Sequence, residues 1–292
     1  TDLLPSLVDP GEVIGTLTDE VAAKVGLPAE TPVIAVGSHD TASAVVGVPS
    51  GDAPSAYISS GTWSLAGLEL PAPILSEDAQ SADFTNEAGV DGTVRFLKNV
   101  MGLWVLSECV RQWREEGREI ELPALLRDAA EEPALRSVVD VDDDSLLPPD
   151  DMCGRLVALA ERAGELVPET PAQFTRLVLD SLALAYRHTV RAASTIAGVR
   201  PEVVHVVGGG SQNELLCQLT ADACDLPVVA GPTEAAALGN VLVQARALGE
   251  DLPDLASMRD LLRRTQALTG YEPGRTSGWD AAEERLRSNP GS

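Results

Sequence analysis

Lysine is nearly absent from this sequence of 292 residues, in which Lys24 and Lys98 are the only two. The chain has 21 Lys and Arg residues against 45 Asp and Glu residues, which gives a formal net charge of −24. Binding to a nucleic-acid backbone or to an anionic membrane surface requires clustered cations. We therefore expect neither nucleic acid nor membrane as a partner.

Aromatic residues and long apolar runs are also scarce. Aromatics make up 3% of the chain, so the core must consist mainly of Ala, Val, Leu and Ile, which suit helices packed on a sheet. No apolar run approaches the roughly 18 residues of a membrane-spanning helix, and the first residues do not resemble a signal peptide. With 44% hydrophobic residues, the composition predicts a folded α/β protein of the cytoplasm.

The chain contains few side chains of the kinds that bind zinc. They are Cys109, Cys153, Cys217 and Cys224, with His39, His188 and His205. No C-x-x-C pair occurs and the histidines are scattered, so the sequence predicts no metal site. Cys217 and Cys224 lie seven residues apart on one face of a predicted helix, where we expect buried, reduced thiols.

The first informative unit is an apolar run over residues 32–37, followed by His39 and Asp40 and then by a second apolar segment over 41–47. This order predicts a strand, a turn and a helix. Asp40 then stands at the end of a strand, where open α/β sheets place ligand-binding groups. The alternative is that Asp40 caps the helix that follows.

A β-hairpin is predicted next, with strands over residues 56–60 and 63–68 and a tip formed by Ser-Gly-Thr. The hydroxyls of Ser59, Ser60 and Thr62 could donate hydrogen bonds to phosphate oxygens. A plain polar turn is the alternative interpretation of the same tip.

Two helices are predicted from apolar periodicity. Between Asn99 and Gly117, apolar residues recur at steps of three and four, and Gly117 favours a left-handed stop. A much longer helix should begin after Thr170, which with Gln173 forms a capping-box pattern, and should end at Gly198.

The segment between these helices, residues 140–151, combines many aspartates with prolines. Like charges and prolines disfavour a buried element, so we expect a solvated loop. A calcium site is the alternative, but the acids lack the alternating spacing, central glycine and closing glutamate of an EF-hand.

A glycine triplet at 208–210 follows a continuous apolar run over 203–207. Ser211 and Glu214 form a second capping-box pattern, which predicts a helix that runs to about Cys224. Backbone without Cβ atoms can approach a planar base or a phosphate closely, and a helix N-terminus favours anions. The triplet is therefore a candidate nucleotide site, and a tight structural turn is the alternative.

A further strand over 227–230 and a helix from 234 to about 240 continue the β–α alternation, which predicts a parallel or mixed sheet. As a dinucleotide-binding fingerprint, the triplet is imperfect because Asn213 replaces the last glycine and Glu234 falls after the next strand. The sequence also lacks a Walker A phosphate-binding loop, because neither lysine follows glycine in that pattern.

Several stretches together resemble one known family. They are residues 37–44 (GSHDTASA), 59–65 (SSGTWSL), 86–87 (NE), 97–104 (LKNVMGLW) and 208–213 (GGGSQN). Their order and their amino-acid sequences resemble the FGGY family of carbohydrate kinases, and within it the members that phosphorylate L-rhamnulose. The resemblance extends from about residue 33 to residue 246.

This resemblance implies a mixed-sheet ATPase domain of the actin, Hsp70 and ribonuclease H kind, with ATP and Mg²⁺ in a cleft between two domains. The implied reaction transfers the γ-phosphate of ATP to the 1-hydroxyl of L-rhamnulose, in rhamnose catabolism. Asp40 matches the catalytic base, His39 and Thr41 match its neighbours on the sugar, and Asn99 matches a further sugar-binding residue.

The same resemblance implies a nucleotide site. Gly61 and Thr62 match residues that hold the ATP phosphates, and Gly209 and Gly210 match residues along the adenosine. Ser107 stands where relatives often carry glutamine near the nucleotide. No residue of this chain matches a metal ligand.

Members of the family begin with an Asp-x-Gly-Thr segment that does not occur before Thr1. We therefore expect residues 1–48 to be the tail of the sugar-binding N-terminal domain and residues 49–292 to be the nucleotide-binding domain. Such a fragment should be inactive without the missing half. The alternatives are a dinucleotide-dependent oxidoreductase that uses the glycine triplet, and a non-catalytic, actin-like nucleotide-binding domain.

Overall fold

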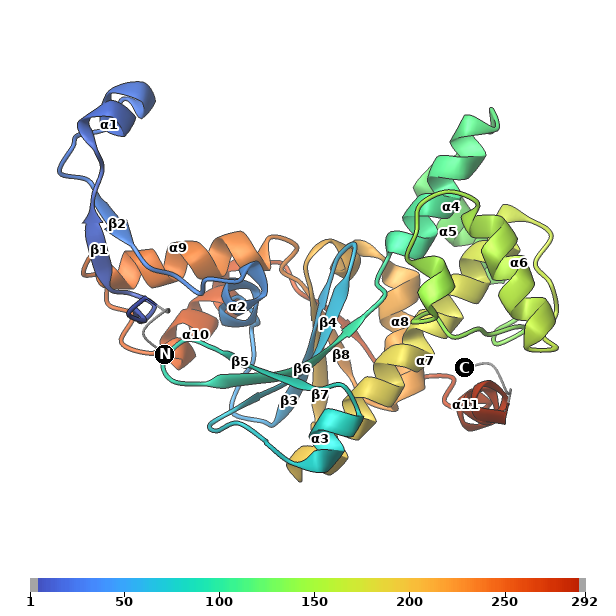
Figure 1. The fold of residues 1–292 in the computed structure, drawn as a ribbon. Helices are drawn as coiled ribbons and strands as arrows, with labels where there is room; N and C mark the ends of the chain where they lie inside the picture. The colour runs from blue at the N-terminus through green and yellow to red at the C-terminus, as the bar shows by residue number, and fades with distance from the viewer. Residues whose placement is uncertain (1–4, 289–292) are drawn as a thin grey trace.

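The computed structural model describes residues 5–288 and contains a seven-stranded and a two-stranded β-sheet (Figure 1). In spatial order the large sheet consists of β5 (Thr85–Ala88), β6 (Val94–Val100), β4 (Ser64–Leu70), β3 (Ser55–Ser60), β7 (Val203–Val207), β8 (Val228–Ala230) and β9 (Thr269–Tyr271). β5, β6, β4 and β3 pair antiparallel, β7 and β8 run parallel to β3, and β9 closes the edge antiparallel to β8. The predicted mixed sheet is confirmed.

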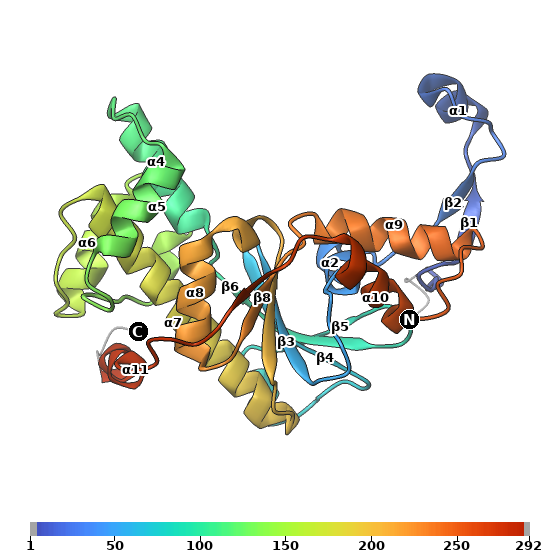
Figure 2. The ribbon, with the colours of Figure 1, turned by 180° about the vertical axis from the view of Figure 1, so that it is seen from behind.

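Helices cover both faces of this sheet. One face is covered by α7 (Pro171–Ala197) and α8 (Glu214–Cys224), and the other by α2 (Asp40–Val46), α9 (Ala235–Ala247) and α10 (Leu255–Thr265) (Figures 1 and 2). Successive strand residues point to opposite faces, so Ile58 lies in the core beneath α7 while its neighbour Tyr57 lies in the core beneath α2. The sheet is therefore the middle layer of three.

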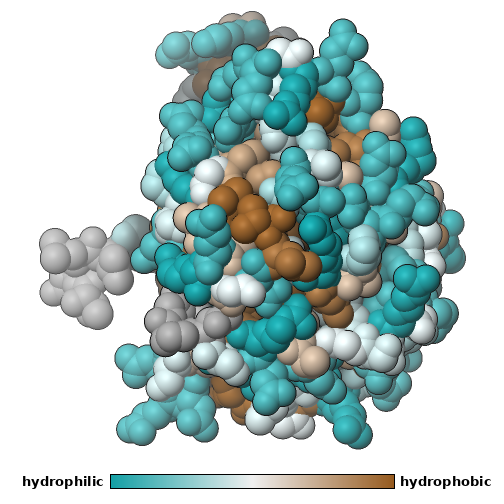
Figure 3. Space-filling view, turned by 90° about the vertical axis from the view of Figure 1, so that its right-hand side faces the viewer, coloured by the Kyte–Doolittle hydropathy of each residue, from teal (hydrophilic) through white to brown (hydrophobic). Residues whose placement is uncertain are grey.

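A cluster of shorter helices lies beside α7. It consists of α4 (Trp104–Glu115), α5 (Leu122–Glu131) and α6 (Met152–Arg162), with α11 (Trp279–Ser288) below it and the small helix α3 (Glu77–Ser81) near β5 (Figure 1). The main core continues into this cluster, where the Trp113 ring meets the Phe174 ring edge-on at 6.1 Å. The outer surface on this side is mainly hydrophilic, with an apolar patch near its centre and smaller apolar areas towards its edges (Figure 3).

The N-terminal arm is a separate unit in which β1 (Val13–Thr16) pairs antiparallel with β2 (Pro32–Ile34), with α1 (Asp19–Val25) beyond them. The arm projects away from the large sheet (Figure 1). Its apolar side chains are unusually exposed, with Val13 and Ile14 each at 57% and Val25 at 55%. The strand predicted over residues 32–37 is present but ends at Ile34.

The prediction of one helix between Asn99 and Gly117 was wrong at its start. Residues 94–100 form β6, which pairs with β4 along its whole length, and the helix begins only at Trp104. The helical period of the apolar residues begins only at Leu103. The residues before it therefore gave no support for a helix that starts at Asn99. The stop was correct, since Gly117 has φ +85° just after α4.

The acidic segment was predicted to be wholly solvated, and this was also wrong. Val141 and Leu146 are buried, and a short 3₁₀ helix, η1 (Asp144–Leu146), packs its one apolar side chain into the main core. The Asp142 carboxylate accepts a hydrogen bond from the Met101 N–H at 2.7 Å. The segment therefore ties the end of β6 to the helical cluster, which aspartate-rich composition alone does not reveal.

The long helix was predicted correctly, because α7 spans Pro171–Ala197 with the Thr170 hydroxyl as its N-cap and Gly198 at φ +65° as its stop. Cys217 and Cys224 are buried, reduced thiols on α8, also as predicted. Within residues 5–288, no helix is long and apolar enough to cross a membrane.

Candidate functional site

The tip of the β3–β4 hairpin meets the glycine triplet at one edge of the large sheet. β3 and β7 are parallel neighbours, so their carboxyl ends lie together. A Cβ atom on Gly210 would overlap the Ser60 side chain, and one on Gly208 would lie 2.8 Å from the Ser60 carbonyl oxygen. Only glycine permits this approach. The structure thus gathers Gly61, Thr62, Gly209 and Gly210 in one place.

The start of α4 supports the hairpin tip from the other side. The Leu103 N–H donates to the Gly61 carbonyl, and the Trp104 N–H donates to the Thr62 carbonyl, each at 3.0 Å. Gly102 permits this contact, because a Cβ there would lie 2.6 Å from the Trp63 carbonyl carbon. Ser107 is exposed one turn further along α4.

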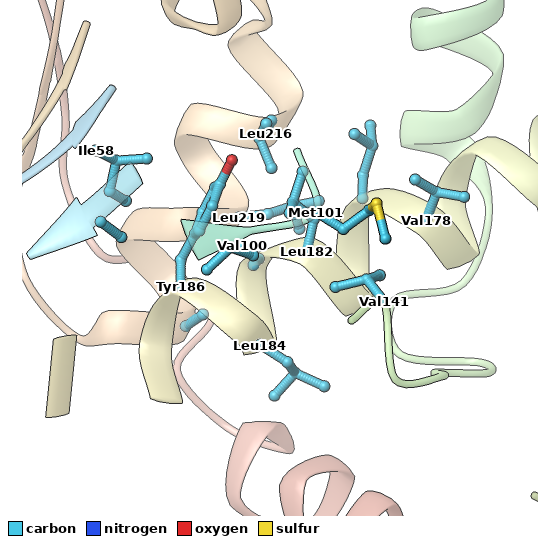
Figure 4. Packing of buried hydrophobic residues seen from close by; sticks show 14 of the residues in the cluster. Ile58, Val100, Met101, Val141, Val178, Leu182, Leu184, Tyr186, Leu216 and Leu219 are labelled. Atoms are coloured by element: carbon cyan, nitrogen blue, oxygen red, sulfur yellow. The ribbon is translucent and has the colours of Figure 1, made fainter. Parts of the chain in front are cut away.

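Tyr186 is a supporting residue that the sequence did not single out. Its hydroxyl lies 2.6 Å from Ser64 Oγ and 3.3 Å from Ser60 Oγ, so it joins both strands just below the tip. Figure 4 shows this side chain rising from α7 between Ile58 and Leu216. Burial raises the pKa of Tyr186 to about 12, which keeps the phenol protonated at neutral pH. In the sequence Tyr186 is indistinguishable from the other apolar positions of α7.

The glycine triplet does not open directly into a helix, which corrects the predicted capping box. Residues Gly209–Gln212 form a 3₁₀ turn, η2, in which Ser211 Oγ donates to the Gly208 carbonyl at 2.7 Å. Asn213 Oδ1 accepts from the Leu216 N–H at 3.0 Å and is therefore the N-cap of α8. The extra turn moves the cap by two residues, because the chain must first leave the strand at Gly208, where φ is +83°.

The surface beside this turn combines exposed backbone with an exposed hydroxyl. Gly209 is exposed, and a Cβ placed on it would meet no atom within 4 Å. Thr62 is exposed opposite it on the hairpin tip. Bare backbone beside a hydroxyl suits a planar base and phosphate oxygens.

Asp40 is the first residue of α2, directly after His39. The alternative that Asp40 is the helix cap was wrong, since His39 occupies the N-cap position and makes no side-chain capping bond. Asp40 Oδ1 accepts a hydrogen bond from the Thr41 N–H at 2.7 Å, while the side chain remains 83% exposed. The carboxylate is therefore held in orientation by its neighbour and accessible to a ligand hydroxyl.

Thr41 and Asn99 occupy different environments. Thr41 is 4% exposed and its hydroxyl lies 3.4 Å from Asp40 Oδ1. The buried hydroxyl of Thr41 therefore contacts the exposed carboxylate of Asp40. Asn99 is exposed on β6, on the same sheet face as Leu97, which packs under α2. Asn99 and Asp40 thus belong to the same side of the sheet.

A chain of polar contacts that the sequence did not predict links α2 to the sheet edge. His39 Nδ1 lies 3.5 Å from Glu87 Oε2 on β5, and the same oxygen lies 2.9 Å from Arg95 Nη2 on β6. Arg95 is 2% exposed. The neighbouring Asn86 has a structural role, since its amide exchanges hydrogen bonds of 2.9 and 2.8 Å with the backbone of Ile74.

Within residues 5–288 we find neither a cluster of metal-binding side chains nor the sheet of a dinucleotide-binding fold. No group of three or more His, Cys, Asp or Glu side chains within residues 5–288 could hold a metal ion, so a metal would need ligands from the nucleotide or from elsewhere. A dinucleotide-binding fold is a doubly wound parallel sheet, whereas β3, β4, β6 and β5 are antiparallel here.

Comparison with known proteins agrees with this geometry. Residues 56–248 match the sequence profile of the FGGY family of carbohydrate kinases, C-terminal domain. A rhamnulokinase of Bacteroides thetaiotaomicron is 45% identical over 275 residues, which cover 94% of this chain and 56% of that protein. A rhamnulokinase of Enterococcus faecalis is 42% identical over 263 residues, which cover 89% of this chain and 52% of that protein. The chain thus spans about half the length of the curated relatives it matches.

Solved structures share the fold at low sequence identity. The xylulose kinase from Lactobacillus acidophilus superposes with a TM-score of 0.73 at 18% identity, over 97% of this chain and 56% of that one. Plasmodium falciparum glycerol kinase, solved with ADP, gives 0.68 at 14% identity, over 98% of this chain and 56% of that one. The mixed sheet with helices on both faces is therefore an actin-like, ribonuclease H-like ATPase fold.

Proposed function

The chain belongs to the FGGY family of carbohydrate kinases, and from this premise we propose that it is the nucleotide-binding portion of an ATP-dependent kinase for L-rhamnulose. The observation that carries the proposal is the meeting of the hairpin tip with the glycine turn, where Gly210 has no room for a Cβ beside Ser60. Two chain segments about 150 residues apart in sequence form one surface of bare backbone and hydroxyls there, as a nucleotide requires.

The residues divide into two groups. We assign Gly61 and Thr62 to the ATP phosphates and Gly209 and Gly210 to the adenosine, with Ser107 near the nucleotide. We assign Asp40 as the general base, and His39, Thr41 and Asn99 to the sugar. The exposure of Asp40 and its hydrogen bond from the Thr41 N–H support this assignment.

The proposed mechanism relies on positioning. MgATP, when bound, supplies the phosphoryl group and the metal charge that balances the phosphate oxygens. The Asp40 carboxylate accepts the proton of the attacking 1-hydroxyl, and Thr41 holds that carboxylate in orientation. The chain of polar contacts from His39 through Glu87 to Arg95 joins the start of α2 to the sheet. General-base catalysis of this kind contributes roughly 10²–10⁴-fold.

The domain assignment is also a proposal. We assign residues 1–48 to the tail of a preceding sugar-binding domain and residues 49–292 to the nucleotide-binding domain. The separate sheet of β1 and β2 and the start of the family match at residue 56 support this division. Close packing of α2 on α9, where Gly47 and Gly239 leave no room for side chains, would keep Asp40 next to the second domain. The kinase would act in the cytoplasm.

The substrate proposal is tested by measuring ADP release with MgATP and four acceptors, L-rhamnulose, L-fuculose, D-xylulose and glycerol. The protein should carry the N-terminal half of the kinase. We expect the highest kcat/KM with L-rhamnulose. A higher value with another acceptor would assign the enzyme to that substrate, and sugar binding without ADP release would favour a non-catalytic nucleotide-binding domain.

The fragment proposal has its own test. The 292-residue chain by itself should bind ATP weakly at best and should not turn over, because the sugar-binding domain and the source of Mg²⁺ ligands would lie elsewhere. Rhamnulose-dependent ADP release by this chain alone would refute the proposal that it needs a separate sugar-binding domain for activity.

A further inference from the structure

A small polar cavity lies at the end of α2, away from the residues assigned to the kinase reaction. Its volume is about 180 Å³, and its wall consists of the end of α2, the loop that joins α2 to β3, the start of β3, Glu69 on β4 and Arg259 on α10. The hairpin tip is at the other end of β3, and Asp40 is at the other end of α2. The cavity is therefore a separate place on the same sheet face.

Unpaired polar atoms are concentrated around this cavity. Within residues 5–288, seven buried side-chain nitrogen and oxygen atoms have no hydrogen-bond partner. Five of the seven belong to four residues on this sheet face or on α10, namely Tyr57, Arg95, His205 and Arg259. Because buried polar groups are nearly always hydrogen-bonded, their concentration here points to a polar ligand that pairs with them.

The register of the sheet places these side chains on one face. Tyr57 on β3 is opposite His205 on β7, and Tyr57 packs with the apolar side chains of α2. On β4, Glu69 follows the strand partner of Tyr57, Gly67, by two residues and therefore points to the same face. Arg95 on β6 is directly opposite Glu69. The residues thus form one polar strip beneath the end of α2.

The unpaired groups nearest the cavity are hydrogen-bond donors. A guanidinium N–H can only donate, and Arg259 Nε and Arg95 Nη1 are both unpaired. Tyr57 lines the cavity, is 3% exposed and has an unpaired hydroxyl. Burial raises the pKa of Tyr57, so this hydroxyl keeps its proton and can also donate. Three unpaired donors, two of them on cations, favour an anion with several acceptor atoms.

The negative charge in the cavity wall is already balanced. Among the described lining residues Glu69 is the only acid, and its two oxygens accept hydrogen bonds from Arg259 Nη2 at 2.7 Å and from a threonine hydroxyl at 2.9 Å. Arg263, one turn further along α10, donates to the carbonyl of Ser50, which also lines the cavity. Its acidic partner, Asp260, is half-exposed at a distance of 3.4 Å. The surroundings therefore tolerate an added negative charge.

We propose that this cavity binds a small tetrahedral oxyanion such as inorganic phosphate, through the Tyr57 hydroxyl, Arg259 Nε and the hydroxyls of Ser50 and Ser55. Its volume is below the roughly 300 Å³ at which pockets for drug-sized ligands begin, so it suits a small ion rather than a nucleotide. The bound ion would tie the loop between α2 and β3 to α10, because both contribute to the cavity wall.

Equilibrium dialysis of the 292-residue chain against radiolabelled inorganic phosphate, at constant ionic strength, tests this proposal. We expect saturable binding of one phosphate per chain, competition by sulfate and no displacement by ATP. Displacement by ATP would place the phosphate at the glycine turn. A lack of saturable binding would show that water satisfies these groups. Either result would overturn the proposal.

Tyr57→Phe removes one donor and leaves the ring in place. Because the hydroxyl has no partner in the protein, the variant without phosphate should unfold at the same urea concentration as the unchanged protein or at a higher one. Its affinity for phosphate should fall about tenfold or more, since a hydrogen bond to a charged group is lost. Tyr271→Phe, at a half-buried position on β9, is the matched control and should bind phosphate normally. A loss of stability without phosphate would show that the Tyr57 hydroxyl is paired within the protein and would contradict the proposal.

Arg259→Lys tests the second donor. Lysine keeps the positive charge beside Glu69 but has no guanidinium Nε–H, so the affinity for phosphate should again fall about tenfold or more. Arg264→Lys, at an exposed position of the same helix, is the matched control and should leave the affinity unchanged. Unchanged affinity in either Tyr57→Phe or Arg259→Lys would place the phosphate elsewhere. If Arg259→Lys does not fold, the two tyrosine variants still decide the proposal.

Discussion

At the scale of single residues, Asp40 combines exposure with a fixed orientation. Its carboxylate is 83% exposed, yet one oxygen is anchored by the Thr41 N–H. A carboxylate arranged in this way can accept a proton from a bound hydroxyl without first changing its conformation.

Asp40→Asn in the kinase that includes the N-terminal half should lower kcat by roughly 10²–10⁴-fold. The amide keeps the size of the side chain but cannot accept the proton as a carboxylate does. The affinity for ATP, measured by titration calorimetry, should stay nearly unchanged because Asp40 is assigned to the sugar. Undiminished turnover in the purified variant would remove Asp40 from the mechanism.

Gly209 and Gly210 are adjacent, but they differ in the space around them. Gly210→Ala should lower the free energy of unfolding by about 1–3 kcal/mol, since the new methyl group must displace Ser60, which Tyr186 holds in place. Urea denaturation measures this change. Gly209→Ala is the matched control, since its Cβ would meet no atom within 4 Å.

The same pair separates packing from ligand binding. Gly209→Ala should leave the unliganded protein stable but reduce the rise in Tm on addition of ATP, because its methyl group would occupy the space assigned to the adenosine. Equal unfolding free energies for the two variants would contradict the role of Gly210 in the contact with Ser60.

At the scale of elements, the hairpin tip depends on helices from two other parts of the chain. α4 supports it through backbone hydrogen bonds, and α7 supports it through the Tyr186 hydroxyl. The tip itself is a short turn of small polar residues, so its shape depends on these supports.

Tyr186→Phe should destabilise the fold by about 1–3 kcal/mol, because Ser60 Oγ and Ser64 Oγ are buried and would lose their shared partner. Thermal unfolding with and without ATP measures the effect. The change in stability should be accompanied by weaker ATP binding if the hydroxyl positions the tip. Unchanged stability together with unchanged ATP affinity would contradict that role.

At the scale of the whole molecule, the negative charge and the shortage of lysine limit how this chain can hold a triphosphate. Lys98, one of the two lysines, lies 3.9 Å from Asp83 and on the sheet face beneath α7, with Phe96 and Val100. We therefore expect the proposed nucleotide site to use glycine backbone and hydroxyls rather than lysine.

The stability of the fold should depend on pH through His205, which lies buried in β7. Burial, with the positive charges of Arg259 and Arg263, lowers its pKa from 6.5 to about 4. The unfolded chain therefore binds a proton at higher pH than the folded chain, and His205 removes stability as the pH falls from about 6.5 towards 4. The full loss is roughly 3 kcal/mol.

Urea denaturation at pH 7 and at pH 4.5 measures this dependence. His205→Phe, which keeps a similar volume and does not titrate, should show a smaller loss of unfolding free energy between the two pH values. An identical loss in both proteins would show that other groups cause the acid sensitivity.

The sequence predicted those parts of the fold that depend on neighbouring residues. Thr170 and Gly198 mark the ends of α7 because capping and left-handed stops are local events. The predicted hairpin is present as β3 and β4, and the glycine turn follows β7. The errors lie where a local pattern was overruled, as at β6, whose strand is stabilised by pairing with β4 rather than by its own periodicity.

By itself, then, the sequence determined the β3–β4 hairpin, the long helix α7, the glycine turn after β7 and the family resemblance, because apolar periodicity, turn residues and short motifs are properties of short stretches of chain. Only the tertiary structure decided which stretches meet. Ser60 and Tyr186 are 126 residues apart in sequence, and the contact of His39 with Glu87 is likewise long-range. Such contacts depend on how the layers pack, and no local pattern encodes that packing.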